Sequence, residues 1–177
     1  VMPGDADIEE KMQYVREYVQ ATKGTRIGTV LLCAAIFQTL YEFVVGLADA
    51  MKMCYEQRDL MEEMLDASAD YYAKMVEIAV AEGLDVVYMA DDLAWKEGLF
   101  IPPQLFKEIW APRAQRVIEP ALSAGAMVIF HSDGKVDDAL DWLIDMGFQG
   151  FNPMDPYGID YRAYKKRYGD RITLMGN

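Results

Sequence analysis

The stretch MVIFHSDGK (127–135) decides the fold class, because it shows how a buried strand ends in this chain. Four apolar residues run directly into His131, the chain's single histidine, and then into Ser132 and Asp133. A run that is apolar throughout is typical of a strand covered on both faces, as in the parallel sheets of α/β proteins. Polar residues gather at the carboxyl ends of such strands. The stretch therefore predicts a buried parallel strand over 126–130, followed directly by a polar site.

Apolar runs and amphipathic segments alternate along the rest of the chain. The predicted strands cover 26–35, 84–90, 126–130, 148–152 and 172–176, and the predicted helices cover 5–22, 36–52, 57–82, 104–124, 135–146 and 158–168. Glycines close most of these helices, as they commonly do. Pro112 and Pro120 are expected to break or kink the helix over 104–124. The alternation indicates parallel strands joined by crossover helices.

Two architectures fit this alternation, a doubly wound open sheet and a (β/α)8 barrel. The chain has no G-x-G-x-x-G or Walker motif, which a dinucleotide-binding or P-loop sheet would carry. Five strands in 177 residues are fewer than a complete barrel has. We predict an α/β fold of the TIM-barrel type, present in part. The expected organisation is one domain over 1–177, with a surface helix in 1–25 leading into the first strand.

The composition indicates which binding partners and which cellular compartment are expected. The chain is 53% hydrophobic and carries a net charge of −12, which disfavours a nucleic acid or an anionic membrane surface as partner. Its two cysteines lack metal-type spacing and indicate no disulfide scaffold, so a cytoplasmic setting is expected. No apolar run approaches the roughly 18 residues of a membrane span, and no signal peptide is recognised.

Polar residues concentrate at one end of the predicted strands. The carboxyl ends hold Asp91, Asp92, His131, Ser132, Asp133, Asn152, Asp155 and Asn177, whereas the opposite ends hold Arg26, Asp85, Gln149 and Arg171. Because the carboxyl ends converge on one face, the first set is the candidate active site. Simpler interpretations stay open, since aspartates often cap turns and a lone histidine is often structural.

The ordered motifs from 84 to 177 resemble the uroporphyrinogen decarboxylase superfamily, which also contains zinc-dependent methyltransferases that serve corrinoid proteins. The matching pieces are GLDVVYMADD (83–92), PQLF (103–106), Pro112, VIFHSDG (128–134), FNP (151–153) and YGDRITLMGN (168–177). The upstream TVLLCAAIFQTLYEFVVG (29–46) is similar more weakly. The resemblance implies a (β/α)8 barrel to which this chain supplies roughly strands three to seven.

The two branches of the superfamily differ within the opening stretch. Decarboxylases end this strand in F-x-K-D/G-G, which Asp133 and Gly134 resemble, whereas the methyltransferases carry H-x-C-G with zinc on the histidine and the cysteine. His131 matches the methyltransferase histidine, and Asp133 stands where the cysteine would be. An imidazole and a carboxylate can both bind Zn²⁺. The metal ligands would then be His131 and Asp133, completed by Asp91, Asp92 or a residue outside this sequence.

The decarboxylase branch removes CO₂ from the acetate groups of a porphyrinogen without a cofactor. On this interpretation the catalytic candidates are Asp91, Asp92, His131 and Asp133, and the substrate-binding candidates are Tyr41, Ser132, Lys135, Asn152 and Asn177. The family's substrate-binding tyrosine falls near Tyr41, although the alignment puts Glu42 at that position. Lys96 and Lys135 are the available cations for a substrate rich in carboxylates.

Three functions remain open. Decarboxylases are the more frequent branch of the superfamily, which favours the first of these functions by a narrow margin. The first is a cofactor-free decarboxylase of porphyrin biosynthesis that acts on a tetrapyrrole. The second is a zinc-dependent methyltransferase that moves a methyl group between a methylated substrate or a corrinoid protein and a thiol. The third is a non-catalytic fragment. The resemblance also implies a homodimer.

Overall fold

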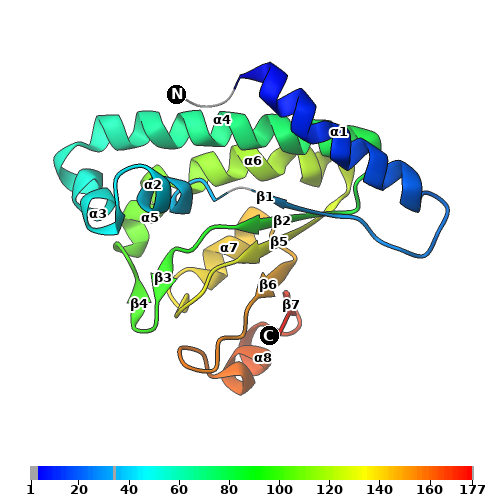
Figure 1. The fold of residues 1–177 in the computed structure, drawn as a ribbon. Coiled ribbons are helices and arrows are strands. Elements are labelled where there is room, and N and C mark those ends of the chain that lie inside the picture. Colours follow the sequence, from blue (N-terminus) through cyan, green and yellow to red (C-terminus); the bar gives the residue numbers. More distant parts are fainter. Residues whose placement is uncertain (1–3, 34, 177) are drawn as a thin grey trace.

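The computed structural model describes residues 4–33 and 35–176, which form a parallel sheet with helices packed along it (Figure 1). The strands of this sheet are β1 (Val30–Cys33), β2 (Val86–Ala90), β5 (Met127–His131), β6 (Gly150–Asn152) and β7 (Thr173–Leu174), and β3 (Ala94–Trp95) and β4 (Gly98–Leu99) form a separate antiparallel hairpin. The helices are α1 (Asp5–Thr22), α2 (Gln38–Phe43), α3 (Leu47–Glu56), α4 (Arg58–Glu82), α5 (Pro103–Ile109), α6 (Ala111–Ala124), α7 (Leu140–Met146) and α8 (Tyr161–Tyr168).

The strand order identifies the architecture. The five-stranded sheet has the order β1-β2-β5-β6-β7, and each strand is parallel to its neighbours. In a doubly wound sheet the order reverses at a switch point, whereas here neighbours in the sheet follow one another along the chain. This order is that of a (β/α)8 barrel, of which the described residues form part. The prediction of a partial α/β barrel is confirmed.

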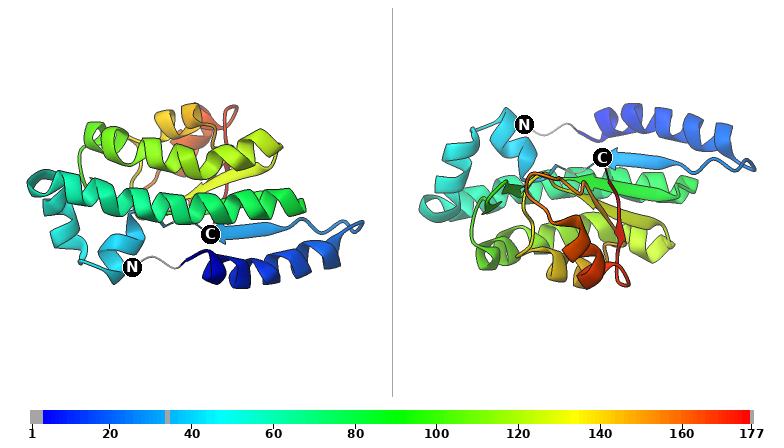
Figure 2. Two further views of the ribbon diagram at one scale, coloured as in Figure 1. Left: turned by 90° about the horizontal axis from the view of Figure 1, so that it is seen from above. Right: turned by 90° about the horizontal axis from the view of Figure 1, so that it is seen from below.

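Helices cover one face of the sheet. The long helices α4 and α6 pack against each other, as the view from above shows (Figure 2). α4 contacts β1, while α6 contacts β2 and β5, and α1 lies against α4. No helix of the described residues is long and apolar enough to cross a membrane.

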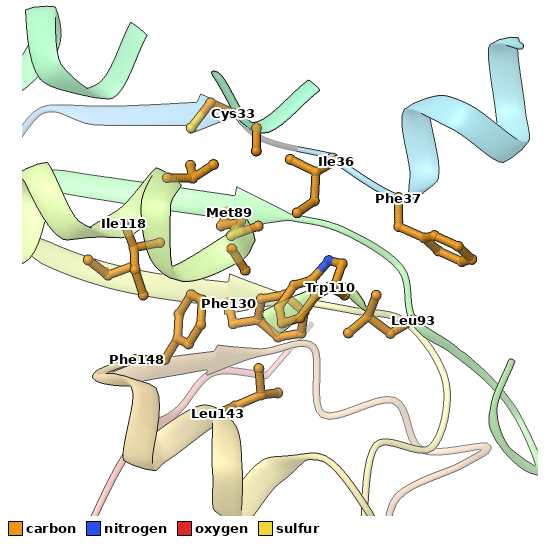
Figure 3. Close-up of a cluster of buried hydrophobic side chains, with 14 of the residues drawn as sticks. Cys33, Ile36, Phe37, Met89, Leu93, Trp110, Ile118, Phe130, Leu143 and Phe148 are labelled. Atoms are coloured by element: carbon orange, nitrogen blue, oxygen red, sulfur yellow. The ribbon is translucent and has the colours of Figure 1, made fainter. Parts of the chain in front are cut away.

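The core lies between this helical layer and the sheet (Figure 3). Met89 and Phe130, on adjacent strands, are fully buried and face the helices. The indole of Trp110, at the start of α6, packs edge-on against Phe130, with ring centroids 5.6 Å apart. Each such side chain contributes about 1.5–3 kcal/mol of stabilisation through burial. The core thereby fixes the positions of β2 and of β5, the central strand of the sheet.

The opposite face of the sheet, which we call the interior face, is open in the described part of the chain. Val30 and Leu32 are 53% and 67% exposed, whereas Leu31 and Cys33 between them are buried. Met127 lies in line with Val30 across the sheet, because both residues are in register with Val86 of β2. Met127 is also exposed. Strands of parallel sheets are normally buried on both faces, so this apolar surface is unusual.

Two predicted helices are each divided in the structure. The helix expected over 36–52 is α2 and α3, and Gly46 between them has a positive φ of 86°. The helix expected over 104–124 is α5 and α6, with Pro112 in the first turn of α6, where its missing N–H costs no hydrogen bond. Pro120 does not end α6, which continues to Ala124.

Other elements are shorter than predicted, and one was not predicted. The strand expected over 26–35 begins only at Val30, and the helix expected over 135–146 begins only at Leu140. The hairpin of β3 and β4 lies in a segment for which neither a strand nor a helix was predicted. His131 itself belongs to β5, so the opening strand reaches one residue further than predicted.

Candidate functional site

The strand register places three polar side chains together on the interior face. Ala90 pairs with His131, and His131 pairs with Asn152, so these positions lie side by side across β2, β5 and β6. Tyr88 lies two residues before Ala90 and shares its face, because side chains alternate along a strand. All of them lie at or near the carboxyl ends of their strands, where barrel enzymes place their active sites.

One nitrogen of the His131 imidazole lies within this group. Its Nδ1 lies 2.8 Å from Asn152 Oδ1 and 3.0 Å from the Tyr88 hydroxyl oxygen. The Tyr88 hydroxyl also donates to Asn152 Oδ1. The Asn152 amide nitrogen in turn donates to the carbonyl oxygen of Gly176, at 3.2 Å. The imidazole is therefore held from one side by neighbours on two adjacent strands.

The other imidazole nitrogen faces two carboxylates. His131 Nε2 lies 3.8 Å from Asp92 Oδ1 and 4.0 Å from Asp133 Oδ1. One ligand atom from each residue lies within 4.8 Å of the others, a spacing that can hold a metal ion. The backbone N–H of Asp133 donates to Asp92 Oδ1 at 2.8 Å and ties the two acidic loops together. These three residues are the candidate metal site.

Burial and mutual repulsion shape the charge of this cluster. Burial raises the pKa of the Asp92 carboxyl, and the negative charge of Asp133 adds to the shift, although the hydrogen bond from the Asp133 backbone N–H opposes it. Burial and the nearby Asp92 carboxylate raise the pKa of Tyr41 well above its usual value. The Tyr41 hydroxyl stays protonated at neutral pH and donates to the backbone carbonyl of Asp92, at 3.3 Å. The site therefore favours a bound cation.

Asp91 lies on the opposite face from its neighbour Asp92. It is fully buried, and its carboxylate accepts from Trp110 Nε1 at 2.6 Å and from the backbone N–H of Gln38 at 2.7 Å. The backbone N–H of Phe37 lies 3.1 Å from both carboxylate oxygens. The structure thus places Asp91 beneath the site, where it ties the start of α2 to β2, and not among the candidate metal ligands.

A pH prediction follows from Asp91. Burial raises the pKa of its carboxyl to about 7, although the hydrogen bonds from Trp110, Gln38 and Phe37 oppose the shift. Because the folded pKa exceeds the unfolded value, the folded protein binds the proton more tightly. The stability that this proton supplies is complete below about pH 4 and is lost as the pH rises through about 7. We expect the free energy of unfolding of the wild type, minus that of Asp91→Asn, to fall by up to about 4 kcal/mol across this range. Denaturant titrations at several pH values measure this difference in unfolding free energy. A difference that does not change with pH would contradict the prediction.

Gln38, at the start of α2, connects both aspartates. Its backbone N–H donates to Asp91, and its side-chain oxygen accepts from the backbone N–H of Asp92 at 3.1 Å. Its side-chain nitrogen lies 3.4 Å from Asp92 Oδ2. The loop after β2 is therefore anchored to the start of α2 through the backbone and the side chain of one residue.

The remaining predicted site residues differ in their positions. Ser132 is fully buried, and its hydroxyl accepts from the backbone N–H of Leu93 at 3.0 Å, so it supports the loop. The ammonium group of Lys135 pairs with Asp137 at 3.3 Å. Asn177 lies outside the described residues. The binding roles of Tyr41, Ser132, Lys135, Asn152 and Asn177 stay predictions.

The hairpin of β3 and β4 rests on the loop that follows His131. The backbone N–H of Lys135 donates to the carbonyl oxygen of Trp95 at 2.8 Å. Gly134 has a φ of +81°, and a Cβ added there would lie 2.6 Å from the Trp95 carbonyl carbon. Only glycine allows this approach, which holds the loop carrying Asp133 in place. The side chain of Trp95 itself is half exposed.

Tyr88, Gln38 and Trp110 were not predicted as parts of the site. Tyr88 was detectable, because it is the one polar side chain within β2 and lies two residues before that strand ends. Trp110 and Gln38 reach the site only through the packing of α2 and α6. Nothing in their local sequence indicates those contacts.

Fold and site together define a barrel-type α/β protein with a histidine–carboxylate cluster at the carboxyl ends of its strands. The family model described as uroporphyrinogen decarboxylase (URO-D) matches residues 2–177. The chain therefore belongs to the uroporphyrinogen decarboxylase family, as the resemblance indicated.

Relatives within this family carry two different names. The chain is 31% identical over 141 residues to the methylcobamide:CoM methyltransferase MtaA of Methanosarcina barkeri (strain Fusaro), covering 78% of this chain and 39% of that protein. It is 28% identical over 130 residues to a uroporphyrinogen decarboxylase of Methylococcus capsulatus, covering 71% of this chain and 35% of that protein. The chain thus spans well under half the length of these relatives.

A solved structure supports the fold. A methyltransferase from Methanosarcina mazei superposes with a TM-score of 0.71 over 93% of this chain and 48% of that chain. The sequences are 23% identical, so this likeness bears on the fold alone. It agrees with the barrel order of the strands.

Proposed function

We propose that this chain carries the metal site of a zinc-dependent methyltransferase, which moves a methyl group from a methylated corrinoid partner to a thiol. The observation that carries the proposal is the position of His131 Nε2 opposite the carboxylates of Asp92 and Asp133. The relatedness to MtaA, at 31% identity, supports the same choice. This reverses the narrow preference for a decarboxylase that the sequence suggested.

The residues present fit a catalytic zinc ion. Such sites commonly use three protein ligands, drawn from histidine, carboxylate and cysteine, and leave a fourth position open. Tetrahedral ligands at zinc bond lengths lie about 3.3 Å apart. The distances of 3.8 and 4.0 Å around His131 Nε2 need only small side-chain movements to reach that spacing. Asp133 is 65% exposed and can move readily.

A zinc ion held by these residues would lower the pKa of a thiol at its open position, so that the thiol would react as a thiolate. The protein's own part is to hold His131, Asp92 and Asp133 in place and to balance the positive charge with two carboxylates. In the overall reaction the sulfur forms a bond to the methyl carbon, and the carbon–cobalt bond breaks with its electron pair left on cobalt. The thiol proton passes to solvent.

Removal of the imidazole tests this proposal. We expect the purified protein to bind about one equivalent of zinc, and His131→Ala to lower zinc affinity at least 100-fold by loss of its nitrogen ligand. Methyl transfer from methylcobalamin to a small thiol should fall in parallel. Zinc content is measured by atomic absorption after dialysis, and methylation by the absorbance change of the cobalamin.

The matched control for this test is Asp170→Asn, which removes a carboxylate just before β7, at the opposite end of the strands. Its zinc content and activity should equal those of the wild type. Zinc that remains at full stoichiometry in His131→Ala would refute the proposed site.

Uroporphyrinogen decarboxylation is the second candidate, favoured by the relative in Methylococcus capsulatus. The negative charge of Asp92 and Asp133 opposes it, because a substrate rich in carboxylates requires cations. Conversion of uroporphyrinogen by chelator-treated, metal-free protein would establish this alternative. A protein that neither binds zinc nor converts either substrate would support the non-catalytic interpretation.

A further inference from the structure

We infer that Asn152 is a positioning residue that, together with Tyr88, holds the neutral His131 ring in the tautomer with its proton on Nδ1. The sequence had suggested a substrate-binding role for Asn152. The structure points to a different role, because both polar atoms of its side chain are already engaged within the protein. What the tautomer means for zinc rests on the proposed function, whereas the tautomer itself follows from the hydrogen bonds alone.

The chain after β7 fixes the orientation of the Asn152 amide. The side-chain nitrogen lies 3.2 Å from the carbonyl oxygen of Gly176 and 3.5 Å from that of Met175. Backbone carbonyl oxygens only accept, so the NH₂ group must face them. A flipped amide would place its oxygen against both carbonyl oxygens, with no hydrogen between them. The Tyr88 hydroxyl can donate or accept, so the two carbonyls decide the orientation. Asn152 Oδ1 therefore faces His131.

The orientation of this amide then decides where the imidazole proton lies. An amide oxygen only accepts, and it lies 2.8 Å from Nδ1, so Nδ1 must donate. The Tyr88 hydroxyl gives its own proton to Asn152 Oδ1, which leaves its oxygen free to accept as well. With the proton on the other nitrogen, two lone pairs would oppose each other at 2.8 Å. Both neighbours of Nδ1 thus favour the same tautomer.

The consequence appears at the opposite side of the ring. With the proton on Nδ1, the lone pair of Nε2 points toward the carboxylates of Asp92 and Asp133, which lie beyond hydrogen-bond distance. Three electron-pair donors then surround one space, which suits a divalent cation. Metal-bound histidines commonly donate their second nitrogen to a carbonyl or carboxylate, which fixes the ring and strengthens the ligand.

The single histidine of the chain makes the tautomer directly measurable. Protein without a histidine tag is labelled with ¹⁵N-histidine and studied metal-free near pH 8, where an ordinary imidazole is neutral. We expect the ¹⁵N chemical shift of Nδ1 to be that of a protonated ring nitrogen. The ¹⁵N chemical shift of Nε2 should be that of an unprotonated ring nitrogen. A wild-type spectrum with the proton on Nε2 would overturn the inference, and this result depends on no variant.

Two replacements of Asn152 separate positioning from general packing. Asn152→Leu removes the acceptor and should shift the tautomer toward a proton on Nε2. Asn152→Asp keeps an acceptor oxygen and should retain the proton on Nδ1. An unchanged tautomer in a folded Asn152→Leu variant would overturn the role of Asn152. If this variant does not fold, Asn152→Ser is measured in its place, with the same expectation.

Zinc affinity, measured by competition with a chromogenic chelator, supplies a second result. It should fall 10- to 100-fold in Asn152→Leu and remain near the wild-type value in Asn152→Asp. Equal losses in both variants would contradict the positioning role. A wild-type protein with the proton on Nδ1 but no affinity for zinc would refute the proposed function and leave the tautomer inference intact.

Discussion

Replacing Asp91 by alanine is expected to lower the free energy of unfolding by about 3–5 kcal/mol, although Asp91 is not one of the candidate metal ligands. The change leaves three N–H groups without their acceptor, the buried ones of Phe37 and Trp110 and the partly buried one of Gln38. Each buried unsatisfied donor costs about 1–3 kcal/mol. Urea denaturation followed by tryptophan fluorescence measures the loss.

Asp92→Ala is the matched control for this prediction. The Asp92 carboxylate is partly exposed, so the groups that it leaves behind can bind water, and we expect a loss below about 1.5 kcal/mol. On the proposed function this variant should lose zinc while it stays folded, whereas Asp91→Ala should lose stability first. Equal destabilisation by the two variants would show that the buried network does not anchor α2.

Gly134→Ala is expected to destabilise the protein by about 3 kcal/mol or more. The new methyl group would lie 2.6 Å from the carbonyl carbon and oxygen of Trp95, so either the hairpin or the loop after β5 must move. The positive φ of +81° adds about 1–2 kcal/mol of strain for any residue with a Cβ. Thermal and denaturant unfolding measure the total.

Gly125→Ala separates the two causes. Gly125 has a nearly equal φ of +77°, and nothing lies within 4 Å of its added Cβ, so its replacement reports the strain alone. We expect Gly134→Ala to cost at least about 2 kcal/mol more than this control. Equal costs would show that the hairpin yields freely and does not hold the loop of Asp133.

The order of strands and helices could be predicted because its signals are local. Apolar runs mark β2 and β5, and left-handed glycines at the ends of α4, α6 and α7 mark the turns into the next strands. The hairpin of β3 and β4 could not be predicted in this way. Its strands have two residues each, too few for any periodic pattern.

The contents of the site were predictable only in part. Asp91 and Asp92 directly follow β2, and the alternation of the strand continues into them, so they lie on opposite faces. The sequence could not tell which of the two faces the helices, because β2 is apolar on both sides. The partners of His131 depend on the pairing of β2, β5 and β6, which brings together residues 43 and 21 positions apart along the chain. Local patterns carry no information on such a register.

The strand order also has a consequence for how the protein assembles. In the main sheet each strand from β2 onward joins the strand that precedes it, and only the small hairpin intervenes. Each βα unit can therefore dock as soon as it has been synthesised, without waiting for a distant partner. His131 and Asn152 come together when β6 docks on β5, and β7 then brings the Gly176 carbonyl. The imidazole environment is thus complete only after β5, β6 and β7 have all been synthesised.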